Sequence, residues 1–230
     1  LRVRQAFSHA IDREAISNAV MQGLEVPAYT MLPGGFPCSQ ADDPEIRAIQ
    51  AYDPERAKAL MAEAGYADGA GFPGFELWTR QGQVVTEAEA IQRMLKDTLG
   101  VDVTPKDQER SFFMDRLAAY EIPVGIVQWV QDYSDPTNFL DWWASGSRHS
   151  WQNERFIELI NQARGELDPE TRCQMYQEAE RILIEDVGGV FIGHPVEGIL
   201  WSDRLGGLRV SKDGVRRNSY LTWVDVYIKR

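Results

Sequence analysis

Apolar residues recur at helical spacing through much of the chain, and most of these stretches follow a residue that can cap a helix. The first stretch, residues 3–11, carries its apolar side chains on one face. Later stretches begin after side chains that can accept a hydrogen bond from a first helical turn, which are Asp12, Asp43, Asp53, Asn153 and Asp168. Three of these aspartates precede a proline, which suits the first helical position. The pattern predicts a chain rich in short, clearly bounded helices.

Shorter apolar runs predict strands. Residues 75–79 alternate between apolar and polar side chains, and residues 101–103 follow a glycine. Residues 124–129 form a continuous apolar run that is typical of a buried strand. A fourth run, residues 190–192, ends just before His194.

Helical patterns separate the first three strand runs. Thr86 and Glu89 have the spacing of a capping box, and Ser111 can cap the helix that follows. Strands that alternate with helices in this way are expected to be parallel and joined by crossover helices. The sequence therefore predicts an α/β fold with a mixed, mostly parallel sheet flanked by helices.

The segment of residues 125–140 combines a strand run, an acidic loop and a helix start. Asp135 precedes Pro136 and is expected to cap the helix that follows. In open α/β sheets ligands bind outside the carboxyl ends of strands, where this order would place Trp129, Asp132 and Tyr133. The alternative is that Trp129 fills the core and Asp132 is a solvated turn residue. The nearby Trp142, Trp143 and Trp151 likewise suit either a core or a pocket wall.

Composition limits the classes of function. The chain has 230 residues, 43% of them hydrophobic, which is enough for a sizeable core, and no apolar run approaches the length of a membrane helix. Its net charge of -11 and the absence of a clustered Lys/Arg footprint argue against nucleic-acid binding. Cationic or amine-bearing ligands suit this charge better.

The sequence has no clear catalytic, metal or cofactor motif. Its three histidines, His9, His149 and His194, lie in separate contexts without the spacing of zinc or haem ligands. Asp132 and Asp135 could act as paired carboxylates, so a carboxylate-dependent hydrolase is the alternative function. If Asp135 caps a helix, however, one free acid remains. We expect a binding protein that is not an enzyme and has no cofactor or metal.

Three motifs resemble those of the family 5 extracellular solute-binding proteins, the peptide-, dipeptide- and nickel-binding components of ABC importers. Residues 129–140 match its signature Trp-x-x-Asp-Tyr-x-Asp-Pro-x-Asn-Phe-Leu. Residues 3–16 are similar to the helix that opens the second lobe of these proteins, and residues 52–66 to the next helix. The resemblance is weakest at residues 38–50 and after Asp203.

The resemblance implies an architecture and a role. We expect residues 1–230 to form one α/β domain, the second lobe of a type II periplasmic-binding-protein fold, cut from a longer protein. Residues 208–230 would return toward the first lobe. The expected function is to capture an oligopeptide, a dipeptide or another small solute between the lobes and deliver it to ABC permease subunits. The expected form is a periplasmic or membrane-anchored extracellular monomer.

The resemblance also assigns roles to residues. Asp132 would pair with the α-ammonium group of a peptide, while the backbone of Gln128 and Val130 would pair with its main chain. Trp129 would wall a side-chain pocket, and Tyr133 would lie beside it. At Ile126 the oligopeptide-binding branch has an arginine, so its pocket is only partly reproduced.

Further contacts are expected from two loops. Arg80 is the only cation in residues 79–86, where the dipeptide-binding branch has a longer loop with a carboxylate-binding arginine. Residues 23–40 carry Tyr29 and Met31 in a loop that borders the ligand cavity in the family, although a structural role fits both residues as well. Cys38 and Cys173 lie in unrelated contexts, and we expect them to be unpaired.

Overall fold

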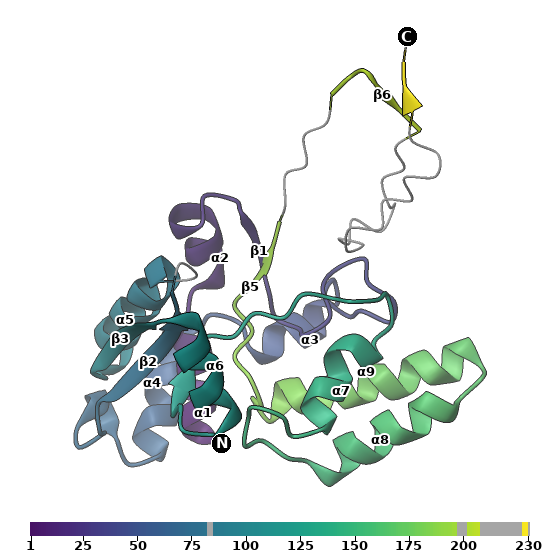
Figure 1. Cartoon of the computed structure of the whole chain (residues 1–230). Helices are drawn as coiled ribbons and strands as arrows, with labels where there is room; N and C mark the ends of the chain where they lie inside the picture. Colours follow the sequence, from purple (N-terminus) through teal and green to yellow (C-terminus); the bar gives the residue numbers. More distant parts are fainter. Residues whose placement is uncertain (82–84, 197–201, 208–226, 230) are drawn as a thin grey trace.

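The computed structural model describes residues 1–81, 85–196, 202–207 and 227–229 (Figure 1). Its α-helices are α1 (Arg2–Ala10), α2 (Arg13–Ala15), α3 (Pro44–Ile49), α4 (Pro54–Glu63), α5 (Val85–Leu99), α6 (Arg110–Ala118), α7 (Thr137–Ala144), α8 (Glu154–Gly165) and α9 (Pro169–Glu185). A π-helix, η1 (Ile16–Val20), continues α2, and a 3₁₀ turn, η2 (Ala67–Gly69), follows α4. The strands are β1 (Glu25–Pro27), β2 (Phe75–Arg80), β3 (Val103–Gln108), β4 (Val124–Gly125), β5 (Gly193–Pro195), β6 (Leu205–Gly206) and β7 (Tyr227–Ile228).

The central sheet has the order β3-β2-β4, and both of its strand pairs are parallel. Helix α5 connects β2 to β3 and α6 connects β3 to β4, which confirms the predicted strand and helix order. β1 pairs with β5, and β6 with β7, in antiparallel ribbons. Most of the predicted return of residues 208–230 lies outside the described residues.

Three strand predictions were wrong in position. β3 shares only Val103 with the strand predicted at residues 101–103 and continues to Gln108. The predicted buried strand at residues 124–129 is in fact a two-residue edge strand, β4, and Val124 and Val127 are each 39% exposed. β4 has β2 as its one neighbour in the described sheet, so its other side pairs with no described strand. The fourth strand runs from Gly193 to Pro195, three residues later than predicted, where it pairs with β1.

The helix starts follow the capping side chains closely. The predicted caps Asp12, Asp43, Asp53, Asn153 and Asp168 each accept a hydrogen bond from a main-chain N–H of the first turn. Three caps were misplaced. The N-cap position of α7 is Pro136 and not Asp135, although Asp135 accepts from the N–H of Thr137. Glu109, not Ser111, caps α6 by accepting from the N–H groups of Ser111 and Phe112 at 2.9 and 3.1 Å. Helix α5 already begins at Val85, so Thr86 lies inside it.

Two clusters of buried side chains form the core. One lies among α1, α4, α5 and the strands β2 and β3 and includes Leu60, Leu77 and Ile91. The other lies among α7, α8 and α9 and includes Leu140, Phe156 and Leu183. Figure 1 shows the two groups of elements side by side, with β1 and β5 between them.

A buried polar network lies between the two clusters. The Arg13 side chain is fully buried, and its guanidinium donates to five main-chain carbonyls, those of Ser8, Ile11, Ala28, Gln50 and Phe191. Gln50 continues the network by donating to the carbonyls of Ile184 and Gly189 at 3.0 and 3.2 Å. Burial lowers the pKa of Arg13 to about 10, so the group stays charged at neutral pH. These bonds tie the first helices to the end of α9.

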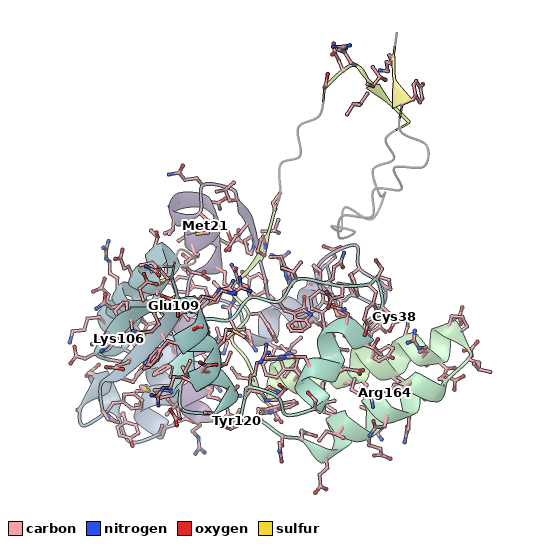
Figure 2. All side chains as sticks on the ribbon, viewed as in Figure 1. Met21, Cys38, Lys106, Glu109, Tyr120 and Arg164 are labelled. Atoms are coloured by element: carbon pink, nitrogen blue, oxygen red, sulfur yellow. A yellow bond between two sulfur atoms is a disulfide. The ribbon has the colours of Figure 1, made fainter. Side chains whose placement is uncertain are left out.

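The expectation of unpaired cysteines was wrong. Cys38 and Cys173 form a disulfide, with their Cα atoms 5.1 Å apart (Figure 2). Their contexts seemed unrelated because the two residues are 135 positions apart in the sequence, and the fold alone brings the loop of Cys38 against α9.

Candidate functional site

The segment that joins β4 to α7 crosses from the sheet to the α7, α8 and α9 group (Figure 1). It leaves the sheet after Ile126, whose N–H donates to the carbonyl of Trp78 at 2.9 Å. Beyond that bond, the main-chain groups of Gln128 and Val130 make no hydrogen bond within the described part of the chain. An extended segment with open donors and acceptors can pair with another extended chain.

Exposed side chains line the same segment. Gln128 is exposed, and Val130 and Tyr133 are each 52% exposed. With Val127 they give the segment an apolar surface beside its open main-chain groups. Gln128, Val130 and Tyr133 are therefore all exposed along this segment.

Trp129 is half-buried and is hydrogen-bonded to α7. Its indole N–H donates to Asn138 Oδ1 at 2.9 Å, and Asn138 is itself 5% exposed. The ring of Trp142 lies 6.3 Å from that of Trp129 between centroids. Trp129 thus packs partly against the second core cluster, as a core residue would, and keeps part of its surface open, as a residue of a binding site would.

Asp132 and Asp135 have different surroundings. Asp132 is exposed and has no hydrogen bond or ion pair among the described residues. Asp135 accepts two hydrogen bonds from Arg172 at 2.8 and 2.9 Å, and it accepts from the N–H and hydroxyl of Thr137 at 3.1 and 2.7 Å. Burial alone raises the pKa of Asp135, but these hydrogen bonds lower it by more, and the net pKa lies below its usual value. Asp135 therefore anchors the start of α7, and Asp132 is open to a ligand.

The three remaining candidates lie in other places. Arg80 is the last residue of β2, at the carboxyl end of the strand. Met31 packs against the second core cluster. Tyr29 is 9% exposed, and the guanidinium carbons of Arg13 and Arg47 lie 5.1 and 4.9 Å from the centroid of its ring.

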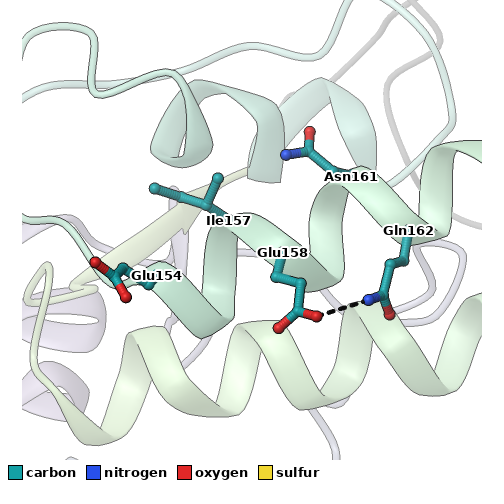
Figure 3. A pocket seen from close by; sticks show the side chains of 5 residues that line it. All are labelled: Glu154, Ile157, Glu158, Asn161 and Gln162. Atoms are coloured by element: carbon teal, nitrogen blue, oxygen red, sulfur yellow. Dashed lines mark hydrogen bonds between the residues drawn. The ribbon is translucent and has the colours of Figure 1, made fainter.

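Tyr29 lines a cavity of about 360 Å³ that none of residues 128–133 reaches. A larger hollow of about 540 Å³ lies on the outer face of α8 and is lined by Glu154, Ile157, Glu158, Asn161 and Gln162 (Figure 3). Its lining comes from a single helix and includes none of the predicted site residues. The geometry thus favours the segment from Ile126 to Tyr133 as the site, and it separates Tyr29 from that site.

Sequence reasoning missed the residues that support this segment. Asn138 and Arg172 hold Trp129 and Asp135, and Glu180 accepts from the N–H of Leu32 at 2.7 Å. Asn138 stands in the quoted motif, so its position was a usable signal. Arg172 and Glu180 lie on α9, 37 and 148 residues from their partners, and no local pattern connects them.

Within the described ranges no helix is long and apolar enough to span a membrane.

Comparison with protein families gives a match over residues 1–151 to the bacterial extracellular solute-binding proteins, family 5 Middle. The chain is 31% identical over 196 residues to the dipeptide-binding protein DppE of Bacillus subtilis, covering 80% of the chain and 35% of that protein. It is 30% identical over 222 residues to heme-binding protein A of Haemophilus influenzae, covering 90% and 39%. The chain spans 35 to 41% of the length of such curated relatives.

Solved structures agree with these relatives. A periplasmic oligopeptide-binding protein of Borrelia burgdorferi superposes with a TM-score of 0.76 at 28% identity, over 84% of this chain and 39% of that one. A dipeptide-binding protein from Pseudoalteromonas in complex with Met-Leu superposes with a TM-score of 0.75 at 25% identity, over 99% of this chain and 45% of that one. These superpositions confirm the predicted fold class, an α/β architecture of the periplasmic binding proteins.

Proposed function

We infer the function of this chain from its family, because the chain belongs to the bacterial extracellular solute-binding proteins, family 5. We propose that it forms the second lobe of a monomeric two-lobed receptor. In that receptor a peptide or similar small solute is held between the lobes and is passed to the membrane permease of an ABC importer. The Salmonella typhimurium relative is named a periplasmic oligopeptide-binding protein, which supports a periplasmic location for this receptor.

The observation that carries the proposal is the contrast between Asp132 and its neighbours. Asp132 is an exposed carboxylate without a partner in the described chain, beside a segment whose main chain is open at Gln128 and Val130. A peptide that pairs with this main chain would place its amino group at Asp132 and a side chain against Trp129. Main-chain pairing is indifferent to side-chain identity, and the ion pair between Asp132 and the ammonium group fixes the register of the peptide on the segment.

Peptides are the ligand class that the relatives favour. The Pseudoalteromonas protein is solved with Met-Leu, and the Bacillus and Borrelia relatives are named for dipeptides and oligopeptides. One relative, however, is named a heme-binding protein, so the relatives are not all named for peptides. We therefore propose an amine-bearing peptide as the ligand of this receptor.

The hydrolase alternative fits the geometry poorly. A catalytic pair needs one carboxyl group with a raised pKa to act as the acid. Asp135 has a lowered pKa and both oxygens occupied by Arg172, so it is poorly suited to donate a proton. The relatives are likewise named as binding proteins.

Mass spectrometry of the solute released on denaturing the intact receptor tests this function. The expected result is a peptide or another solute with a free amine. Its yield should drop in Asp132→Asn and persist in Asp97→Asn, which removes an exposed carboxylate on α5 far along the chain. Recovery of a solute without a cationic group, in equal yield from both variants, would exclude Asp132 as the anchor.

A further inference from the structure

Helix α9 contacts two loops, one of which belongs to the candidate site. We define the ligand loop as residues 131–137, which contains Asp132, and the cover loop as residues 28–42, which contains Tyr29 and Met31. One side of α9 bears Arg172 and Tyr176, and the neighbouring side bears Cys173, Gln177 and Glu180. Because helical positions three and four apart share a face, these residues form two adjacent rows.

The first row holds the ligand loop. Arg172 makes a two-pronged ion pair with Asp135, and its Nη2 also donates to the hydroxyl of Tyr176 at 3.0 Å. Its Nε donates to the carbonyl of Ala163 at 3.1 Å, which fixes the guanidinium against α8. The fork geometry of arginine on a carboxylate restricts orientation as well as distance. The position of Asp132, three residues before Asp135, therefore depends on Arg172.

The second row holds the cover loop. Cys173 is bonded to Cys38, the carbonyl of Gln177 accepts from Gln40 at 2.9 Å, and Glu180 accepts from the N–H of Leu32 at 2.7 Å. These three tethers are spread along two turns of the helix. The cover loop has no strand or helix between Ala28 and Asp42, so its shape depends on the tethers to α9.

The two loops also meet one another. Phe36 of the cover loop packs edge-on against Phe139, with centroids 5.1 Å apart, and Phe139 lies two residues after the ligand loop, in α7. Both rings are buried. A shift of the cover loop away from α9 therefore removes a packing partner from the start of α7, and the start of α7 is also where Asp135 is bound.

We propose that α9 positions the ligand site through two linked tethers, the Cys38–Cys173 disulfide and the Arg172–Asp135 pair, so that releasing either tether loosens both loops. Arg172 and the two cysteines are then positioning residues, which act on the ligand through Asp132 and do not touch it. This inference rests on the proposed function for its link to affinity. The coupling of the two loops does not depend on the ligand.

Hydrogen exchange measured by mass spectrometry on the purified protein tests the coupling. Tris(2-carboxyethyl)phosphine opens the disulfide with one molecule of water: the phosphine gives two electrons and takes the oxygen of the water to become its oxide, and the two sulfurs take up the two protons of the water as thiols. We expect amides in both loops to exchange about tenfold faster after reduction, which corresponds to about 1.4 kcal/mol, while α5 is unchanged. Acceleration confined to the cover loop would overturn the coupling, as would acceleration throughout the chain.

Arg172→Gln gives the reverse experiment, since it keeps the disulfide. The expected result is faster exchange in the ligand loop and also in the cover loop, with restoration toward wild type in Arg172→Lys, which keeps the charge. Arg155→Gln is the matched control, because Arg155 forms exposed ion pairs with Glu158 and Glu178 on the α8 and α9 surface and touches neither loop. A response of the ligand loop alone would show that the loops are independent.

Affinity separates this inference from the proposed function. In the intact receptor, titrated with the solute recovered from it, Arg172→Gln should weaken binding about tenfold and Arg155→Gln should leave it unchanged. If the exchange results appear as expected and the wild-type receptor binds no amine-bearing solute, the coupling stands and the proposed function fails. If binding is normal in both the reduced protein and Arg172→Gln, the positioning role is refuted.

Discussion

At the residue scale, two aspartates three positions apart have opposite surroundings. Asp132 faces solvent without a partner in the described chain, and Asp135 is bound by Arg172 and Thr137. In a closed cleft a desolvated carboxylate pairs strongly with an ammonium group, and loss of one partner typically costs about 2 to 5 kcal/mol. We predict that Asp132→Asn weakens an amine-bearing solute about a hundredfold in the intact receptor. Calorimetric titration measures the affinity, and a thermal scan should show an unchanged melting temperature.

Asp135→Asn should mainly lower stability, and it should weaken binding only about as much as Arg172→Gln, about tenfold, because it breaks the same ion pair. The substitution removes the negative charge of a partly buried ion pair and one of the two oxygens that Arg172 contacts, so the free energy of unfolding at pH 7 should fall by about 2 kcal/mol. Because the folded-state pKa of Asp135 is lowered, this stabilisation is present above the pKa of the unfolded aspartate and is lost as the pH falls through the folded pKa. Urea unfolding of both proteins from pH 7 to pH 3 should show the difference shrinking below about pH 4. A pH-independent difference would mean that the ion pair contributes nothing.

Arg13 is the residue with the largest expected effect on stability. Its removal would leave five carbonyls of the buried network without their donor. We predict that Arg13→Met lowers the free energy of unfolding by about 3 to 5 kcal/mol, measured by urea denaturation. Arg47→Met is a suitable control, because Arg47 also lies over the Tyr29 ring and its side chain is 44% exposed. Equal losses in the two variants would assign the effect to Tyr29 stacking and not to the carbonyl network.

At the element scale, the sequence predicted what is decided locally. Five of the caps and the strand and helix order of the sheet follow from residues within a few positions of each other, and the structure has them. The predictions failed where distant partners decide. β4 is short because it is a sheet edge, β5 is shifted because it pairs with β1, and Cys38 meets Cys173 across 135 positions. For the candidate site, the motif predicts Trp129 and Asp132, but the supporting residues on α9 could not be derived from it.

Helix α9 also carries a buried acid whose ionisation opposes folding. Burial raises the pKa of Glu180 to about 7, and its Oε2 has no hydrogen-bond partner within the described residues. A raised folded-state pKa means that stability is highest below the unfolded pKa and declines as the pH rises toward 7. Glu180→Gln keeps an oxygen acceptor for the N–H of Leu32 and cannot ionise.

We therefore predict that Glu180→Gln gains stability relative to wild type between pH 5 and pH 8, by up to about 3 kcal/mol. Thermal or urea unfolding at the two pH values measures the change. The control is Glu185→Gln, which replaces an exposed acid on α9 that pairs with Arg181. Its stability relative to wild type should not change in this way between the two pH values. If the difference in the free energy of unfolding between Glu180→Gln and wild type does not vary with pH, Glu180 is not the titrating group.

At the scale of the whole molecule, the chain corresponds to 35 to 41% of the length of its curated relatives, and the candidate site is an open edge, not an enclosed cavity. A ligand held on one side of a cleft loses half of its desolvated contacts. We predict that the 230-residue chain alone binds peptides weakly and gives little heat on titration. Submicromolar affinity of this chain by itself would show that the site is complete without a second lobe.

Capture of the solute's amino group at Asp132 can be tested directly. The measurement is a calorimetric titration of the intact receptor, wild type and Asp132→Asn, with the recovered solute and with its N-acetylated form. We predict that acetylation weakens binding to wild type about a hundredfold and hardly changes binding to the variant, because both changes remove the same ion pair. If acetylation weakens binding equally in the two proteins, the amino group is bound elsewhere and Asp132 is not the anchor.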